Sequence, residues 1–382
     1  MGVVRGMRVA ALLCVVVLTL AGDCHESAGP SADRQILWFH KDLAGAAARP
    51  YADSELAVFT TEFDMRVVAL DAKTGALRWE RRIPTTPGQS FYGMPHANIV
   101  AAGDLLIVPA WDLFALDRKT GEIRWEFETP DDYPGWSEVS VADGHIYTGA
   151  WYLYSIDART GQMQWRVDVG RQPGTEQVWR PVASDGIVYL STKPAGSVVN
   201  AAHAMAVDAA TGNVLWRFPI TDPQLGKSGS IGPPALRDTV FVIACYNRNV
   251  YGLDSRSGRL LWAYRGVDNA YTAGAVILDS TVVTGVDGAE GLDLATGKLR
   301  WSWGPIGTIL TPITRAKGTA LISSAVIYAF ASSGELRWRY GGERWGQPVF
   351  NTGATYHDGV VFVGSVDPTS PGPGFYALRV PE

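Results

Sequence analysis

The segment LDAKTGALRW, which occupies positions 70–79, decides the fold because its pattern returns along the whole chain. The pattern is an apolar residue, Asp, two variable residues, Thr-Gly, three variable residues and Trp. Further copies stand at 116–125, 156–165, 207–216, 253–262 (with Ser257 in place of Thr) and 292–301, and a degenerate copy without the Asp ends at Trp338. Successive Trp residues of the pattern are 37 to 51 residues apart, a spacing typical of β-propeller blades.

One copy with its flanks predicts a β-hairpin. In FALDRKTGEIRWEFE (114–128), apolar and polar residues alternate on both sides of Lys-Thr-Gly, as expected for two strands joined by a turn. Gly121 can supply the positive φ of that turn, and Asp117 can accept backbone N–H bonds across it. Two shorter apolar runs precede each hairpin, so each repeat is predicted to form a four-stranded blade.

The two ends of the repeat array predict how the ring closes. The last repeat, 346–380, stops where a third strand would end, whereas QILWF (35–39) resembles an outer strand with no hairpin before it. If the N-terminal strand completes the C-terminal blade, the ring has no open edge. The sequence therefore predicts an all-β fold, an eight-bladed β-propeller of four-stranded blades over residues 35–382. Its expected structural blade anchors are Trp38, Trp79, Trp125, Trp165, Trp216, Trp262, Trp301 and Trp338.

Composition excludes several classes of protein. The chain has 382 residues, of which 47% are hydrophobic, and a formal net charge of −5. This apolar fraction is enough for a packed core, so intrinsic disorder is excluded. Without a basic excess, nucleic acid is not expected as a partner. Three Cys in the whole chain cannot form a disulfide scaffold.

The N-terminus predicts export. Arg5 and Arg8 precede an apolar run of 12 residues (9–20). This run is too short to span a membrane. We therefore interpret residues 1–22 as a signal peptide and residues 23–34 as a polar linker. The mature protein is thus expected outside the cytoplasm, secreted or associated with the cell envelope. Because LAGDC (20–24) also resembles a bacterial lipoprotein signal, with Asp23 intruding, lipidation of Cys24 is an alternative. That anchor is the sole membrane contact predicted, and the pairing of Cys24 with Cys245 stays open.

The motif Asp-x-x-Thr-Gly-x-x-x-Trp resembles the repeat of the pyrroloquinoline-quinone (PQQ) enzymes, and its copies cover essentially all of 35–382. This family includes quinoprotein dehydrogenases, and also non-enzymatic propellers such as the lipoprotein of the outer-membrane β-barrel assembly machinery. Because the repeat is structural, it does not distinguish the two. The dehydrogenase resemblance implies adjacent cysteines and a Ca²⁺ site, but this chain has no adjacent cysteines. No cofactor is therefore expected, and PQQ with Ca²⁺ is the alternative.

The loops entering the inner strands supply the candidate ligand or partner mouth. Alignment of the repeats on the Asp-Gly after each inner strand puts Glu138 and Arg180 at the same position, and Arg-Pro occurs at both Arg49 and Arg180. The proposed mouth comprises Arg49, Trp136, Glu138, Trp179, Arg180, Tyr271 and Trp345. Such a surface could hold a peptide or a small anionic ligand. In the alternative interpretation, Glu138 and Arg180 merely pair and the aromatic residues pack between blades.

The sequence favours a monomeric, exported and non-catalytic scaffold that binds a protein partner or small ligand on its loop face. A small PQQ-dependent oxidoreductase is the alternative. Catalytic, cofactor-binding and metal-binding residues are not predicted, because no two His have helical metal-site spacing and each repeat Asp stands alone in its turn.

Overall fold

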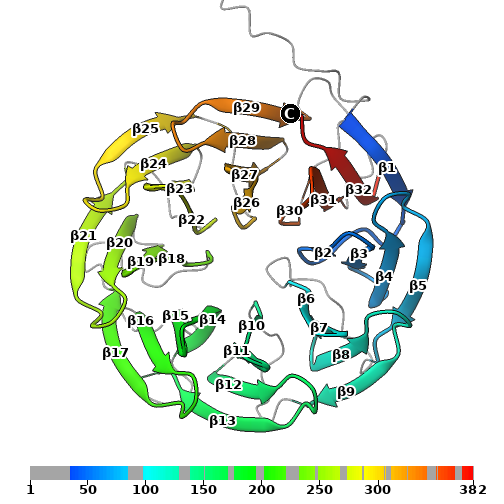
Figure 1. Ribbon diagram of the computed structural model, residues 1–382, viewed down its shortest axis with the longest axis horizontal. Coiled ribbons are helices and arrows are strands. Elements are labelled where there is room, and N and C mark those ends of the chain that lie inside the picture. Colours follow the sequence, from blue (N-terminus) through cyan, green and yellow to red (C-terminus); the bar gives the residue numbers. More distant parts are fainter. Residues whose placement is uncertain are drawn as a thin grey trace, which may run out of the picture.

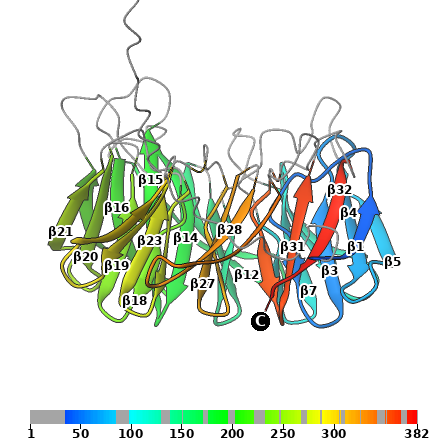
Figure 2. The ribbon, with the colours of Figure 1, turned by 90° about the horizontal axis from the view of Figure 1, so that it is seen from above.

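The repeat array forms a closed ring of β-sheets (Figure 1), and Figure 2 shows the same sheets from the side. The structure is a computed structural model that describes residues 35–84, 98–128, 138–149, 151–170, 176–194, 202–220, 232–245, 248–266, 273–285, 288–304, 306, 311–324, 326–341, 350, 352–365 and 372–381. Every secondary-structure element named within these ranges is a β-strand. The strands form eight four-stranded sheets, which confirms the predicted eight-bladed propeller.

Each blade contributes one inner strand near the ring axis and a second strand beside it. The inner strands are β2 (Tyr51–Ala52), β6 (Val100–Ala102), β10 (Ser140–Ala142), β14 (Glu176–Ser184), β18 (Ala235–Arg237), β22 (Ala275–Leu278), β26 (Thr314–Ala316) and β30 (Thr355–His357). The second strands are β3 (Leu56–Thr60), β7 (Leu105–Pro109), β11 (His145–Gly149), β15 (Ile187–Pro194), β19 (Val240–Ala244), β23 (Thr281–Gly285), β27 (Thr319–Ser323) and β31 (Val360–Ser365).

The third and outer strands carry the two halves of the repeat motif. The third strands are β4 (Arg66–Asp71), β8 (Leu113–Asp117), β12 (Tyr152–Asp157), β16 (Ala202–Asp208), β20 (Asn249–Asp254), β24 (Ala289–Asp293), β28 (Ile327–Ala331) and β32 (Gly374–Arg379). The outer strands are β5 (Leu77–Arg82), β9 (Ile123–Phe127), β13 (Met163–Asp168), β17 (Val214–Ile220), β21 (Leu260–Arg265), β25 (Leu299–Trp303), β29 (Leu336–Tyr340) and β1 (Ile36–Lys41). Blade 1 comprises β2–β5, and the numbering follows the chain to blade 8, which comprises β30–β32 and β1.

The first strand of the chain closes the ring. β1 pairs antiparallel with β32, with Trp38 opposite Ala377, and the order β1-β32-β31-β30 makes blade 8 from both ends of the described chain (Figure 1). The predicted closure by the N-terminal strand is confirmed. Because an edge strand would expose unpaired backbone groups, this pairing leaves the ring without an open blade.

The hydrophobic core is divided among the contacts between neighbouring blades. Eight clusters of buried side chains each join two adjacent blades; for example, Val58 and Val67 of blade 1 pack with Leu106 and Phe114 of blade 2. Second and third strands are almost wholly buried, whereas outer strands such as β5 alternate buried and exposed residues. Blade stacking therefore supplies the apolar burial that stabilises the ring.

The repeat motif joins each blade to the next. In blade 1 the Asp71 carboxylate accepts hydrogen bonds from the Thr74 amide and hydroxyl, each 2.8 Å long, which fixes the turn. Trp38 of blade 8 then donates its indole N–H to the Ala72 carbonyl in that turn, over 3.0 Å. The same bond recurs from Trp79 to Arg118, Trp125 to Ala158, Trp165 to Ala209, Trp216 to Ser255, Trp262 to Leu294 and Trp301 to Ser332.

The Gly of the motif provides the surface on which the indole lies. Gly75 has φ of +70°, and a Cβ at this position would stand 2.7 Å from Cδ2 of Trp38. Gly75 is therefore required for two reasons: it adopts the left-handed backbone conformation, and it allows the indole of Trp38 to approach closely. Trp338 differs from the other anchors, because its buried indole nitrogen has no hydrogen-bond partner in the described chain. It faces blade 8, where β32 and β1 come from opposite ends of the described chain and the motif's turn is replaced by the closure.

Two glycines of blade 3 separate these requirements. Gly161 and Gly144 have similar positive φ, +72° and +76°, but a Cβ on Gly161 would stand 2.7 Å from Cδ2 of Trp125, whereas a Cβ on Gly144 would meet nothing within 4 Å. We expect Gly144→Ala to lower the free energy of unfolding by about 1 kcal/mol through backbone strain. Gly161→Ala should lower the free energy of unfolding by about 2 kcal/mol more than Gly144→Ala does, because the indole of Trp125 must move. Equal losses in denaturant titrations would contradict this role of the Trp contact.

The turn carboxylates predict acid sensitivity. Hydrogen bonds from Arg78 and Thr74 lower the pKa of Asp71 to about 2, and Arg124 beside Asp117 lowers the pKa of that carboxyl to about 2. These values lie below that of an unfolded Asp, about 3.9, so each group stabilises the fold above pH of about 4 and loses this contribution as the pH falls towards 2. The Asp71→Asn and Asp117→Asn double variant should show a shallower decline of unfolding free energy between pH 5 and 2. Asp238→Asn, in a hairpin turn outside the motif, should retain the wild-type slope.

Candidate functional site

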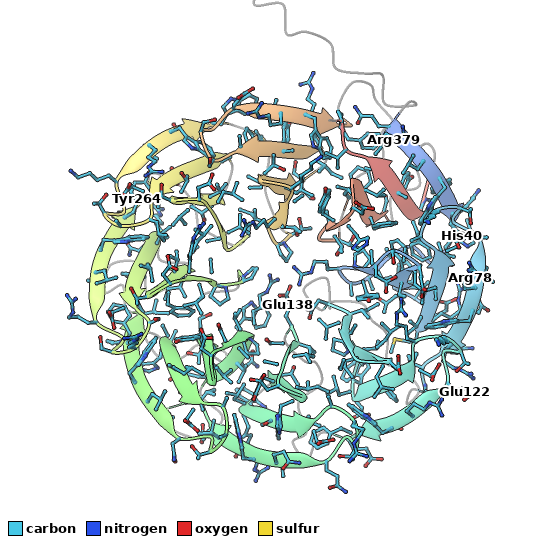
Figure 3. All side chains as sticks on the ribbon, viewed as in Figure 1. His40, Arg78, Glu122, Glu138, Tyr264 and Arg379 are labelled. Carbon is cyan, nitrogen blue, oxygen red and sulfur yellow. The ribbon has the colours of Figure 1, made fainter. Side chains whose placement is uncertain are left out.

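Three charged side chains from different blades meet at the centre of the ring. Arg49 precedes β2, Glu138 precedes β10, and Arg180 lies within β14. Glu138 Oε1 is 3.4 Å from Nη1 of Arg180, and its Oε2 is 3.7 Å from Nη2 of Arg49. Figure 3 places Glu138 near the ring axis. We call these three residues the collar.

The collar belongs to a ring of equivalent positions, each four residues before the last residue of an inner strand. In blades 2 to 8 these positions hold Asn98, Glu138, Arg180, Pro233, Gly274, Pro312 and Gly353. Arg49 takes the corresponding place in blade 1, where it forms an isolated parallel bridge with Asn98. Polar and charged side chains therefore gather over blades 1 to 4, whereas Pro and Gly occupy blades 5 to 8.

Asn98 holds the collar in place and was missed by the sequence reasoning. Its side-chain amide donates to the Val139 carbonyl over 3.1 Å and accepts from the Val139 amide over 2.7 Å. The Ile99 amide donates to the Arg49 carbonyl over 3.3 Å. Asn98 thus connects the backbone beside Arg49 with the backbone beside Glu138. Asn98 lies at the same position of the repeat as Glu138 and Arg180, so alignment of the repeats could have identified it.

Gly353 of the neighbouring blade 8 makes room for Arg49. A Cβ on Gly353 would stand 3.2 Å from Cδ and 3.3 Å from Cγ of Arg49, and a similar distance from Pro312. The aliphatic stem of Arg49 therefore lies close over blade 8. This contact directs the guanidinium towards the centre while its apolar stem stays packed.

Arg180 is held in an unusual conformation. Its φ is +48°, and the pairing of β14 with β15 shifts register between Trp179 and Val182. Its side chain is 1% exposed, and Nε, Nη1 and Nη2 are buried with no hydrogen-bond partner among the described residues. Burial, together with the nearby charge of Arg49, lowers the pKa of Arg180 to about 10, although the charge of Glu138 acts to raise it. The guanidinium stays charged at neutral pH, although its donors are unused.

The collar is suited to binding an anion. Two guanidinium groups face one carboxylate, so the three side chains carry a net charge of +1. Both ion-pair distances exceed the roughly 2.7–2.9 Å of a charge-assisted hydrogen bond. Polar donors buried in this way normally have a hydrogen-bond acceptor.

The structure brings together only part of the predicted mouth. Arg49, Glu138 and Arg180 meet, and the pairing of Glu138 with Arg180 that the alternative interpretation required is present. Trp179 lies on β14 opposite Ser191 and is partly buried. Trp136, Tyr271 and Trp345 lie outside the described residues, as does Cys24. Cys245 is a free thiol buried in the core, which raises its pKa.

Blade 4 carries a second buried polar group. Nδ1 of His203 on β16 lies 2.9 Å from Oε2 of Glu176 on β14, and the Thr192 hydroxyl of β15 donates to the same carboxylate. The Thr192 hydroxyl also accepts from the His203 amide over 2.8 Å. These bonds satisfy the Glu176 carboxylate inside the blade and join its first three strands. Within the described ranges no group of three or more His, Cys, Asp or Glu could hold a metal ion.

A family model matches residues 149–367, more than half of the chain, and it is described as outer membrane protein assembly factor BamB. Among solved structures, BamB from Moraxella catarrhalis is 16% identical with a TM-score of 0.53, covering 87% of this chain and 85% of that chain. Quinohemoprotein alcohol dehydrogenase from Comamonas testosteroni is 15% identical with a TM-score of 0.68, covering 91% and 77%. At these identities the likeness shows the fold alone.

Partial sequence matches extend to quinone-dependent enzymes. The dehydrogenase subunit of alcohol dehydrogenase (quinone) from Gluconacetobacter polyoxogenes is 27% identical over 199 residues, which are 45% of this chain and 25% of that protein. The corresponding subunit from Acetobacter aceti is 32% identical over 149 residues, 32% of this chain and 18% of that protein. The chain thus spans at most about a quarter of the length of these relatives. None of the described residues forms a helix long and apolar enough to cross a membrane.

The chain belongs to the family described as outer membrane protein assembly factor BamB, a family of PQQ-like repeat propellers.

The collar geometry predicts a strong stability effect. Glu138→Gln should lower the free energy of unfolding by about 3 kcal/mol, because it leaves Arg180 buried without its counter-charge. Adding Arg180→Met should recover part of this loss, since the buried charge is then removed as well. Denaturant titrations of both variants and of Arg180→Met alone complete the cycle. Additive losses would show that the two side chains do not interact.

Proposed function

We propose that this member of the family is an exported, non-catalytic propeller that binds a polypeptide partner in the cell envelope through the mouth over its collar. The observation that carries the proposal is the collar itself, a charged group built from three blades with unused donors on Arg180. Buried donors of this kind are suited to recognition by complementary charge. The family's description as an outer membrane protein assembly factor supports a protein partner.

Export is part of the same proposal. It rests on the basic start, the apolar run at 9–20 and the small residues that follow. Lipidation of Cys24 would attach the propeller to a membrane surface through the linker 23–34. Mass spectrometry of the mature N-terminus distinguishes a diacylglycerol-modified Cys24 from an unmodified chain cleaved near Ala21 or Gly22.

An oxidoreductase that uses PQQ and Ca²⁺ is the second candidate, favoured by the partial matches to quinone-dependent dehydrogenases. The described residues do not fit these groups. Glu138 is engaged by two guanidinium groups and Asn98 is bonded at both ends of its amide, although Ca²⁺ requires six or more oxygen ligands. The adjacent cysteines of the dehydrogenase pattern are missing, and Cys245 is buried in the core. Reduction of a dye by the purified protein with PQQ, Ca²⁺ and an alcohol would favour this candidate instead.

Site-specific photo-crosslinking in the native host tests the partner proposal. A photoreactive amino acid at position 179, beside the collar, should form adducts with a specific envelope polypeptide. The same amino acid at position 299 on the outer rim, where Leu299 is 47% exposed, is the matched control. Adding Arg49→Gln should reduce the position-179 adduct several-fold, since the central charge is removed. Adducts formed at position 299 but not at 179 would contradict a partner at the mouth.

A further inference from the structure

The guanidinium of Arg180 has an unmet chemical requirement. All three of its nitrogens are buried, and none has a hydrogen-bond partner among the described residues. A guanidinium presents five N–H donors in a planar fork and can accept nothing. Burying such donors without acceptors is costly, so the site calls for an acceptor.

The backbone at Arg180 is strained in the conformation that buries its side chain. Its φ of +48° lies in the left-handed region, which costs a residue with a side chain about 1–3 kcal/mol. The residue is followed by Pro181 and lies at the register shift of β14. Strain of this kind persists where the surrounding structure imposes it, and it clusters at binding sites. Here it places the side chain of Arg180 beside Glu138.

The charges of the collar specify the missing acceptor. Glu138 is shared between Arg180 and Arg49 at 3.4 and 3.7 Å, so the three side chains lack one negative charge. A monoanion would bring them to neutrality, whereas a phosphate dianion would leave excess negative charge beside Glu138. A planar anion with two oxygens matches the guanidinium fork, which a single chloride cannot do.

We infer that the collar binds a single carboxylate group, whose two oxygens accept hydrogen bonds from Arg180 and whose charge is shared with Arg49. Glu138 tunes the affinity by competing for the same donors. This inference rests on the proposed function in one respect, because the C-terminal carboxylate of a bound polypeptide is one source of the group. A free small carboxylate is the other source, and the chemistry recognised is the same.

Isothermal titration of the full mature protein with sodium formate tests the site directly. Formate should bind saturably to the wild type, with sodium phosphate and sodium chloride at matched ionic strength as comparisons. Glu138→Gln should bind formate about tenfold more tightly, because the competing carboxylate is gone. Arg49→Gln should bind about fivefold more weakly. Arg337→Gln, which removes an exposed arginine paired with Glu335 on the outer rim, should leave the affinity unchanged.

The outcomes are distinct from those of the crosslinking experiment. N-acetyl-triglycine and its C-terminal amide distinguish the sources: binding of the acid but not the amide indicates a polypeptide terminus, whereas binding of formate alone indicates a small free carboxylate. Absence of saturable formate binding by both the wild type and Glu138→Gln would overturn the inference. So would phosphate binding as tight as formate binding, or an unchanged affinity in Arg49→Gln. Formate binding without adducts at position 179 would leave the carboxylate site standing and remove the envelope partner.

Discussion

The propeller depends on the docking of outer-strand indoles onto the turn of the next blade, a contact made by every motif Trp except Trp338 among the described residues. A blade alone exposes apolar faces that only its neighbours can cover. The motif combines three interactions at one contact. Asp71 and its equivalents fix the turn, Gly75 and its equivalents leave a flat surface for the indole, and the indole N–H donates to a turn carbonyl. Seven of the outer-strand indoles make this same bond to a turn carbonyl of the next blade, so the chemistry of one junction is repeated around the circle.

The closure is where this regularity changes. Blade 8 takes its outer strand from the start of the described chain, so the turn that would receive Trp338 is replaced by the pairing of β1 with β32. The indole nitrogen of Trp338 is buried without a partner in the described chain, while Trp38, on the strand that closes the ring, makes the standard bond to Ala72. Backbone pairing between the ends thus substitutes for one indole contact.

The centre of the ring departs from the symmetry of its rim. The same position holds polar or charged residues in blades 1 to 4 and Pro or Gly in blades 5 to 8. Packing explains a small residue in blade 8, because a side chain on Gly353 would collide with the aliphatic stem of Arg49. Packing does not require the charged residues of blades 1 to 4, where the buried Arg180, with its positive φ, faces the carboxylate of Glu138. A stabilising role alone would favour an apolar residue there, since buried ion pairs contribute little net stability.

The sequence by itself determined the blades, their number and the closing strand, because these follow from local turn chemistry and from an indole repeated at a fixed phase. It also put Glu138 and Arg180 in the same phase, which brought them into the candidate site. It could not show that Arg49 reaches Glu138 across blade 2, that Asn98 connects their backbones, or that Arg180 is buried with unused donors. Those facts depend on side chains from separate blades converging near one axis. Only the closed ring decides which of them meet, because its curvature brings residues more than 40 positions apart within a few ångströms.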